Sequence, residues 1–112
     1  MSTVRRIGMV IGIKPEKMDE YKELHSDKNP GVRDLLEKYN IRNFSIFIKR
    51  LPDGNEYLFG YYEYVGQDYE KDMADLSKEP RNVEWLKRCD PCQTPFPGES
   101  TWAKMAEVYH ND

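Results

Sequence analysis

Apolar side chains recur at every second position along residues 3–13, where Ile7, Met9, Ile11 and Ile13 alternate with smaller or polar residues. A period of two places such residues on one face of an extended chain, which is typical of a β-strand with one buried face. The pattern therefore predicts a strand over residues 3–13.

The spacing becomes helical after Pro15, a residue that the first turn of a helix accepts. Met18, Tyr21, Leu24 and His25 fall at i, i+3, i+6 and i+7, so they share one face of a helix expected over residues 15–26.

A second helical segment is expected to begin at Asn29 and Pro30, which suit the N-cap and the first helical position. The apolar stripe of this segment consists of Val32, Leu35, Leu36 and Tyr39.

Alternation returns over residues 42–50 and 56–65, on either side of a turn that contains Pro52 and Asp53-Gly54. These turn residues supply the restricted and positive φ angles of a tight connection, so the two strands are expected to form a hairpin. One face of the first strand is expected to carry Phe44, Ile46 and Ile48, and the other face Ser45 and Phe47.

The rest of the chain predicts a helix over residues 67–77, a further helical turn over 82–88, a proline-rich loop over 91–98 and a last strand over 101–110. The order strand, helix, strand, strand, helix, strand indicates an α+β fold of the ferredoxin-like βαββαβ type, with helices on one face of an antiparallel sheet. We expect one such domain over residues 1–112.

The third predicted strand carries large side chains on both faces, with Tyr57, Phe59 and Tyr61 opposite the face that packs on the helices. Such side chains are expected to be covered by a ligand or by a second subunit. The pattern favours a homodimer that joins two sheets into a barrel-like unit, the dimeric α/β barrel.

Composition narrows the classes of partner. The 112 residues are 33% charged with a net charge of −3, and 38% are hydrophobic, which permits a core and is unlike a disordered chain. The charges are mixed in sign with no basic stripe, so no nucleic-acid partner is indicated. The apolar run near the N-terminus is too short for a membrane span, and we expect a cytoplasmic protein that binds no membrane.

Cys89 and Cys92 form a Cys-x-x-Cys pair, a spacing found in redox dithiols and in zinc sites. Pro91 lies between them and His25 and His110 supply no second ligand pair, so the pattern favours two reduced cysteines.

His25 and Tyr21 are the candidate chemical groups. Four residues apart, they lie side by side on one helix face, and histidine is the side chain whose ordinary pKa best suits proton transfer at neutral pH. By spacing alone, a histidine near a helix end is more often a capping or solvated residue. Trp85 and Trp102 offer flat apolar faces on which a sugar can stack, and any chemistry is expected to need no cofactor beyond acid–base groups.

Several short segments, in their order along the chain, resemble the L-rhamnose mutarotase family. They are the opening strand, Glu20-Tyr21 with His25, Asn29-Pro30, the segment Arg-Asn-Phe-Ser-Ile-Phe at 42–47, Trp85 before the Cys/Pro segment, and Met-Ala-Glu-Val-Tyr-His at 105–110. The resemblance implies a dimeric ferredoxin-like enzyme that interconverts the α and β anomers of a monosaccharide, L-rhamnose or a related deoxyhexose.

Carried over by position, the resemblance makes His25 the catalytic proton donor, Tyr21 a substrate-binding residue and Trp85 the first of two neighbouring tryptophans at the sugar site. Phe44 stands where some members have a sugar-binding tyrosine, and Leu86 stands where they have the second tryptophan. These departures affect the lining of the sugar site, and therefore the choice of sugar, more than the reaction.

The implied mechanism has His25 donating a proton to the ring oxygen while a base takes the proton of the anomeric hydroxyl. The sequence leaves that base open between Tyr21, an acidic residue and water, and it favours a solvated tail position for His110. Two other functions stay open: a small cofactor-free monooxygenase, and a non-catalytic sugar-binding dimer.

Overall fold

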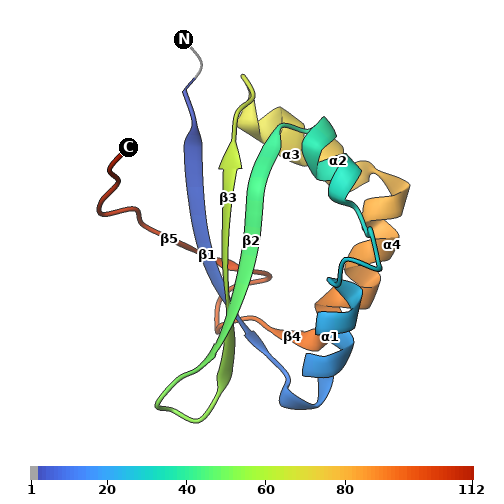
Figure 1. Ribbon diagram of the computed structural model, residues 1–112, viewed down its shortest axis with the longest axis vertical. Coiled ribbons are helices and arrows are strands. Elements are labelled where there is room, and N and C mark those ends of the chain that lie inside the picture. The colour runs from blue at the N-terminus through green and yellow to red at the C-terminus, as the bar shows by residue number, and fades with distance from the viewer. Residues whose placement is uncertain (1–2) are drawn as a thin grey trace.

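The computed structural model describes residues 3–112 and shows a curved antiparallel sheet with helices on one side (Figure 1). Three long strands run side by side in the order β2–β3–β1, and two short strands pair with the free edge of β1. The strands are β1 (Arg5–Ile13), β2 (Ile41–Arg50), β3 (Glu56–Tyr64), β4 (Gln93–Thr94) and β5 (Ala103–Met105).

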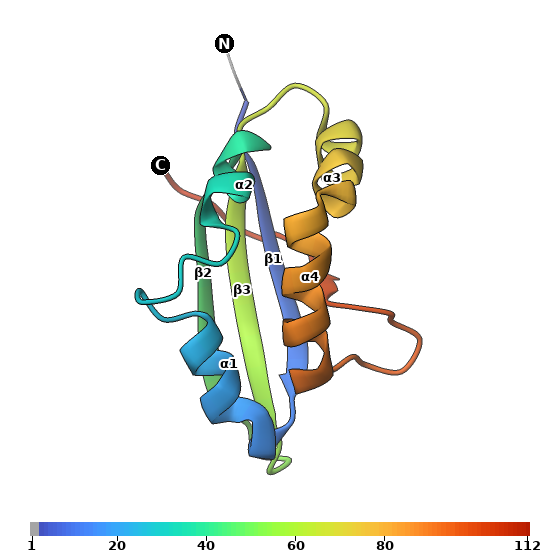
Figure 2. The same ribbon diagram turned by 90° about the vertical axis from the view of Figure 1, so that its right-hand side faces the viewer.

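The helices cover one face of the sheet, as the view in Figure 2 shows directly. They are α1 (Met18–Leu24), which follows the 3-10 turn η1 (Pro15–Lys17), then α2 (Arg33–Lys38), α3 (Tyr69–Lys78) and α4 (Pro80–Cys89), which leads into the 3-10 turn η2 (Asp90–Cys92). The fold is therefore α+β and ferredoxin-like, as the order of elements predicts.

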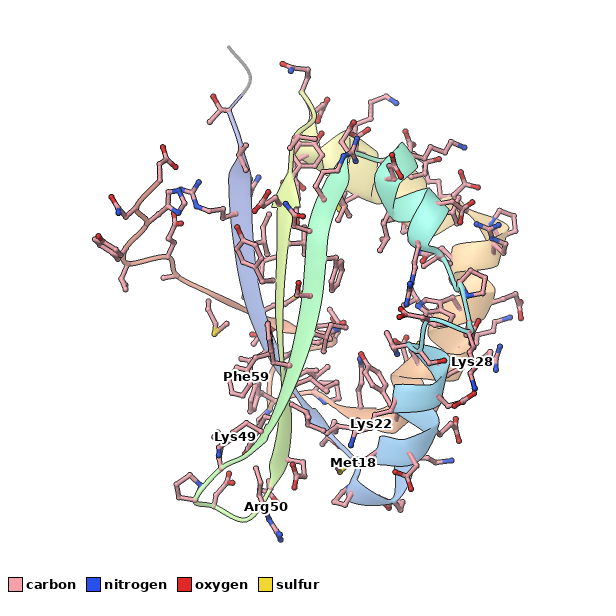
Figure 3. All side chains as sticks on the ribbon, viewed as in Figure 1. Met18, Lys22, Lys28, Lys49, Arg50 and Phe59 are labelled. Carbon is pink, nitrogen blue, oxygen red and sulfur yellow. The ribbon has the colours of Figure 1, made fainter. Side chains whose placement is uncertain are left out.

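Figure 3 shows side chains of both layers extending into the space between them. Lys22 and Lys28 lie on the helical side of the molecule, Lys28 at the connection between α1 and α2, whereas Phe59 and Lys49 come from the sheet. The core has two parts, and Trp85 and Trp102 pack against both.

The predictions for the three long strands and for the first and third helices are confirmed, with shifts of at most three residues at their ends. The helical turn expected over residues 82–88 is a ten-residue helix, α4. It is separated from α3 because Glu79 precedes Pro80 and has an extended backbone, which is the conformation that a following proline favours.

The predicted start of the second helix at Asn29 and Pro30 is wrong. The helix begins at Arg33 with Val32 at the N-cap, and no side chain caps it. Gly31 is the physical reason, because its φ of +56° breaks the chain direction between Pro30 and Val32.

The last strand is also shorter than the predicted 101–110. Only Ala103–Met105 pairs with β1, opposite Gly8–Val10. The following segment leaves the sheet on the side away from the helices (Figure 1), and Glu107 is held by an ion pair to Arg6. Within the predicted loop 91–98, Gln93 and Thr94 form β4.

The outer face of the sheet, opposite the helices, exposes large side chains. Phe47 of β2 is 65% exposed, and Met105, Val108 and Tyr109 of the C-terminal segment are exposed as well. Within residues 3–112, no helix has the length and apolar character that crossing a membrane requires.

Candidate active site

A cavity of about 830 Å³ opens between the helices and the inner face of the sheet. Its lining comes from all four α-helices, the segment between α1 and α2, the three long strands, and the segment from η2 onwards. All five site residues predicted from the sequence line this one cavity: Tyr21, His25, Phe44, Trp85 and Leu86.

The imidazole of His25 lies on the ring of Tyr21, one helical turn earlier, with ring centroids 4.1 Å apart. His25 is the C-cap of α1, so it stands where the helix stops and the chain turns toward α2. Its Nδ1 lies 2.8 Å from the backbone carbonyl oxygen of Tyr21. A carbonyl oxygen can only accept, so Nδ1 carries the proton and donates it.

This hydrogen bond defines the chemistry of the other ring nitrogen. With the proton on Nδ1, a neutral imidazole presents an unprotonated Nε2, and within residues 3–112 this atom makes no hydrogen bond. Burial lowers the pKa of His25 below its ordinary 6.5, and the nearby charge of Arg33 lowers it further, against the opposing effect of the bond to Tyr21. The resting imidazole is therefore neutral at pH 7, with Nε2 ready to accept a proton.

Tyr21 is buried and its hydroxyl is hydrogen-bonded within the protein. It is 4% exposed, and its hydroxyl accepts a hydrogen bond of 3.3 Å from Nε2 of the buried Gln93. Burial raises the pKa of this phenol well above its usual range, so it stays protonated and can donate a hydrogen bond.

The aromatic wall opposite Tyr21 comes from α4. The ring of Trp85 meets the imidazole edge-on, with centroids 5.1 Å apart and an interplanar angle of 64°. A Cβ at Gly31 would lie only 3.0 Å from the nearest carbon of the indole. The wall therefore depends on a glycine that sequence reasoning missed, although Gly after Asn-Pro is a recognisable turn signal.

Phe44 reaches the cavity because β2 contains a bulge. Arg42 pairs with Glu63 and Ser45 with Tyr61, so the two residues Asn43 and Phe44 stand opposite the single residue Tyr62. Asn43 adopts a φ of +53°, and the inserted residue turns Phe44 to the same face as Ile41. The ring of Phe44 then stacks on that of Tyr62 at 5.2 Å.

The cavity also has polar lining residues that sequence reasoning missed. Asn82 is buried and donates from Nδ2 to the carbonyl of Leu76, and Gln93 binds Tyr21. Arg33 lies beside the segment that follows α1, and burial raises the pKa of Asp90. These residues carry no spacing signal, because α2, α4, η2 and β4 bring them to the cavity only through tertiary packing.

The two cysteines show no sign of an activated thiol. Both are free and buried, and burial raises the pKa of Cys89 to about 12. Cys92 lies 3.7 Å from a carboxylate oxygen of Glu20, and burial raises its pKa as well. His110 lies on the exposed C-terminal segment beside Asp112.

Together, a neutral imidazole with one free nitrogen, apolar aromatic walls and a few polar groups suit a small polar ligand with C–H faces. A family model described as L-rhamnose mutarotase matches residues 6–111. The chain belongs to the L-rhamnose mutarotase family. It is thereby an isomerase-type carbohydrate enzyme, as the resemblance implies.

A curated relative agrees with this membership, and a solved structure shares the fold. An L-rhamnose mutarotase of Oceanobacillus iheyensis is 29% identical over 110 residues, which cover 97% of this chain and 100% of the relative. The crystal structure of an L-rhamnose mutarotase from Formosa agariphila has a TM-score of 0.72 at 19% identity and covers 96% of this chain and 99% of that one.

The fold by itself extends beyond this family. Tetracenomycin F2 cyclase from Streptomyces glaucescens, a type-II polyketide cyclase, has a TM-score of 0.61 at 17% identity, with 96% of this chain and 95% of that one covered. Mutarotase membership therefore rests on the sequence match, and the structure adds the placement of the cavity residues.

Proposed function

We propose that this protein interconverts the α and β anomers of L-rhamnose or a related deoxyhexose, with His25 as the group that moves the proton. The observation that carries the proposal is the state of the imidazole. It is neutral, fixed by its Nδ1–H bond to Tyr21, and placed in a cavity with Nε2 unpartnered among the described residues.

The proton path follows from that state. Nε2 accepts the proton of the anomeric hydroxyl, the C1–O5 bond breaks with its electron pair going to O5, and C1 becomes an aldehyde. The imidazolium then donates its proton to O5, so His25 is the donor to the ring oxygen. One nitrogen can serve both oxygens because both are bonded to C1. Rotation about C1–C2 and reversal of the steps give the other anomer.

The aromatic rings support the choice of substrate class. Trp85 and Phe44 present apolar surfaces, and the C–H groups and the methyl group of a deoxy sugar can pack on such surfaces. Leu86 adds an apolar side chain without a polar atom. Tyr21, Phe44, Trp85 and Leu86 are therefore proposed as the substrate-binding residues, with Tyr21 also acting as the platform under the imidazole.

The outer face of the sheet supports a homodimer. Phe47 projects from it with 65% of its surface exposed, and an exposed sheet face with large apolar residues is typical of an interface. Sedimentation velocity over a hundredfold range of concentration tests this proposal, and a species that stays monomeric throughout would contradict it. Phe47→Glu should weaken the dimer, because it places a charge in the interface.

Saturation-transfer NMR tests the function. The α and β C1–H signals of L-rhamnose and of a panel of hexoses are compared with and without protein. We expect faster exchange for at least one deoxy sugar. Binding of a sugar with unchanged exchange would instead indicate a non-catalytic sugar-binding protein, and oxygen uptake with candidate phenols would indicate a monooxygenase.

A further inference from the structure

Arg33 links the first residue of α2 to the end of α1. Its Nη2 donates to the backbone carbonyl oxygens of His25, at 3.2 Å, and Ser26, at 3.3 Å. Its Nη1 donates to the carboxylate of Asp27 at 3.2 Å. The guanidinium thus spans the turn that immediately follows the imidazole.

The place of these contacts matters because a short helix ends there. Carbonyl groups in the last turn of a helix lack partners within the helix, and a cation near them is favourable. Arg33, from the next helix, reaches the carbonyls of the C-cap His25 and of Ser26, the two residues that directly follow α1.

We propose that Arg33 is a positioning residue for His25, whose guanidinium holds the end of α1 so that the imidazole keeps its Nδ1–H bond to Tyr21 and presents Nε2 to the cavity. The proposal rests on the proposed function, in which His25 moves the proton. Arg33 itself need not touch the sugar.

The charge of Arg33 has a second effect on the same group. It disfavours the imidazolium and so adds to burial in lowering the pKa of His25. Trp85, the neighbour of His25 from α4, carries no charge, and Tyr21 from α1 stays protonated. The other charged side chains that line the cavity are Glu37 of α2, Arg42 of β2 and Asp90 of η2.

Two substitutions separate the effect of the hydrogen bonds that Arg33 makes from the effect of its charge. Arg33→Gln removes the charge and the forked donor together. Arg33→Lys keeps the charge but loses the planar fork that reaches two carbonyls and a carboxylate at once. Arg81→Gln is the matched control, because Arg81 also forms an exposed ion pair that ties α2, through Asp34, to α4.

The test is NMR of the protein with labelled histidine, which reports the pKa and the tautomer of His25 directly. We expect Arg33→Gln to raise the pKa of His25, and both Arg33 variants to increase the fraction of the Nε2–H tautomer. Arg81→Gln should change neither. In sugar exchange, Arg33→Lys should lower kcat about tenfold with little change in KM.

The proposal is wrong if Arg33→Gln leaves the pKa and the tautomer of His25 where Arg81→Gln leaves them. This outcome does not depend on sugar turnover. If the wild-type protein accelerates no anomer exchange, the proposed function fails, while the histidine signals still decide the role of Arg33.

Discussion

The imidazole of His25 stacks on the ring of Tyr21 and donates its Nδ1 proton to the backbone carbonyl of the same residue, 2.8 Å away. Tyr21 is itself fixed by Gln93 of β4. One residue thus sets both the orientation and the tautomer of the histidine, and the sequence spacing of four brings these two groups together.

The pH dependence follows from the lowered pKa of His25. Burial disfavours the imidazolium, so the neutral, proton-accepting form persists to below pH 6.5. We expect the enzymatic exchange rate to be constant near pH 7 and to fall as the pH drops through a midpoint below 6.5. Exchange spectroscopy at several pH values, with the uncatalysed rate subtracted, measures this. A rate that rises as the pH falls would contradict a neutral imidazole as the resting form.

Tyr21→Phe separates two roles of Tyr21, the stacking of its ring on the imidazole of His25 and the hydrogen bonding of its hydroxyl. The ring and the backbone carbonyl remain, so the tautomer of His25 should be unchanged. The buried Gln93 loses its partner, which should lower the free energy of unfolding by roughly 1–3 kcal/mol in a denaturant titration. Tyr57→Phe is the control, since that hydroxyl binds Asp53 at the surface. Equal stability of the two variants would argue against the Tyr21–Gln93 bond.

Gly31→Ala should disturb the wall that Trp85 forms. The new Cβ would lie 3.0 Å from the indole, and φ at this position is +56°. Gly54→Ala provides the matched control, because Gly54 has a φ of +86° and a Cβ added there would meet no atom within 4 Å. Both should lose about 1–2 kcal/mol from the left-handed backbone.

Only Gly31→Ala should also change the tryptophan emission and slow sugar exchange. If the two variants have the same stability, emission and exchange rate, Gly31 is not needed for the position of Trp85.

Phe44→Tyr adds a hydroxyl to the cavity at the position where some family members have tyrosine. A matched polar contact can discriminate between related sugars by about 1–3 kcal/mol. We expect the ratio of exchange rates for L-rhamnose and the other accepted sugars to change by about tenfold. Phe47→Tyr, on the outer face of the same strand, should leave the ratio unchanged. If neither variant changes the ratio of exchange rates, Phe44 does not contact the sugar.

Most of the fold follows from patterns that act locally. The period of two marks the long strands, and the faces of β3 and of the first helix are as predicted. The predicted start of the second helix fails because a single residue overrides the local pattern. Gly31 delays α2 despite the favourable Asn29 and Pro30, and only three residues of the predicted last strand pair with β1.

Part of the candidate site could also be predicted from the sequence. Tyr21 and His25 share a helix face, and family resemblance supplies Phe44, Trp85 and Leu86. Neither source could supply Arg33, whose contacts run backwards across a turn to the carbonyls of His25 and Ser26. Every residue has a backbone carbonyl, so the sequence does not show which carbonyls a side chain will bind. Only the tertiary structure reveals these hydrogen bonds of Arg33.

The most direct measurement is the α/β exchange rate of L-rhamnose with wild-type protein and with His25→Gln. Glutamine can still donate to the carbonyl of Tyr21 but cannot carry the proton between the two oxygens. The account predicts rapid exchange with the wild type and a rate lower by about 10²–10⁴-fold with the variant, with unchanged circular dichroism. A folded His25→Gln variant that exchanges L-rhamnose as fast as the wild type would contradict the account.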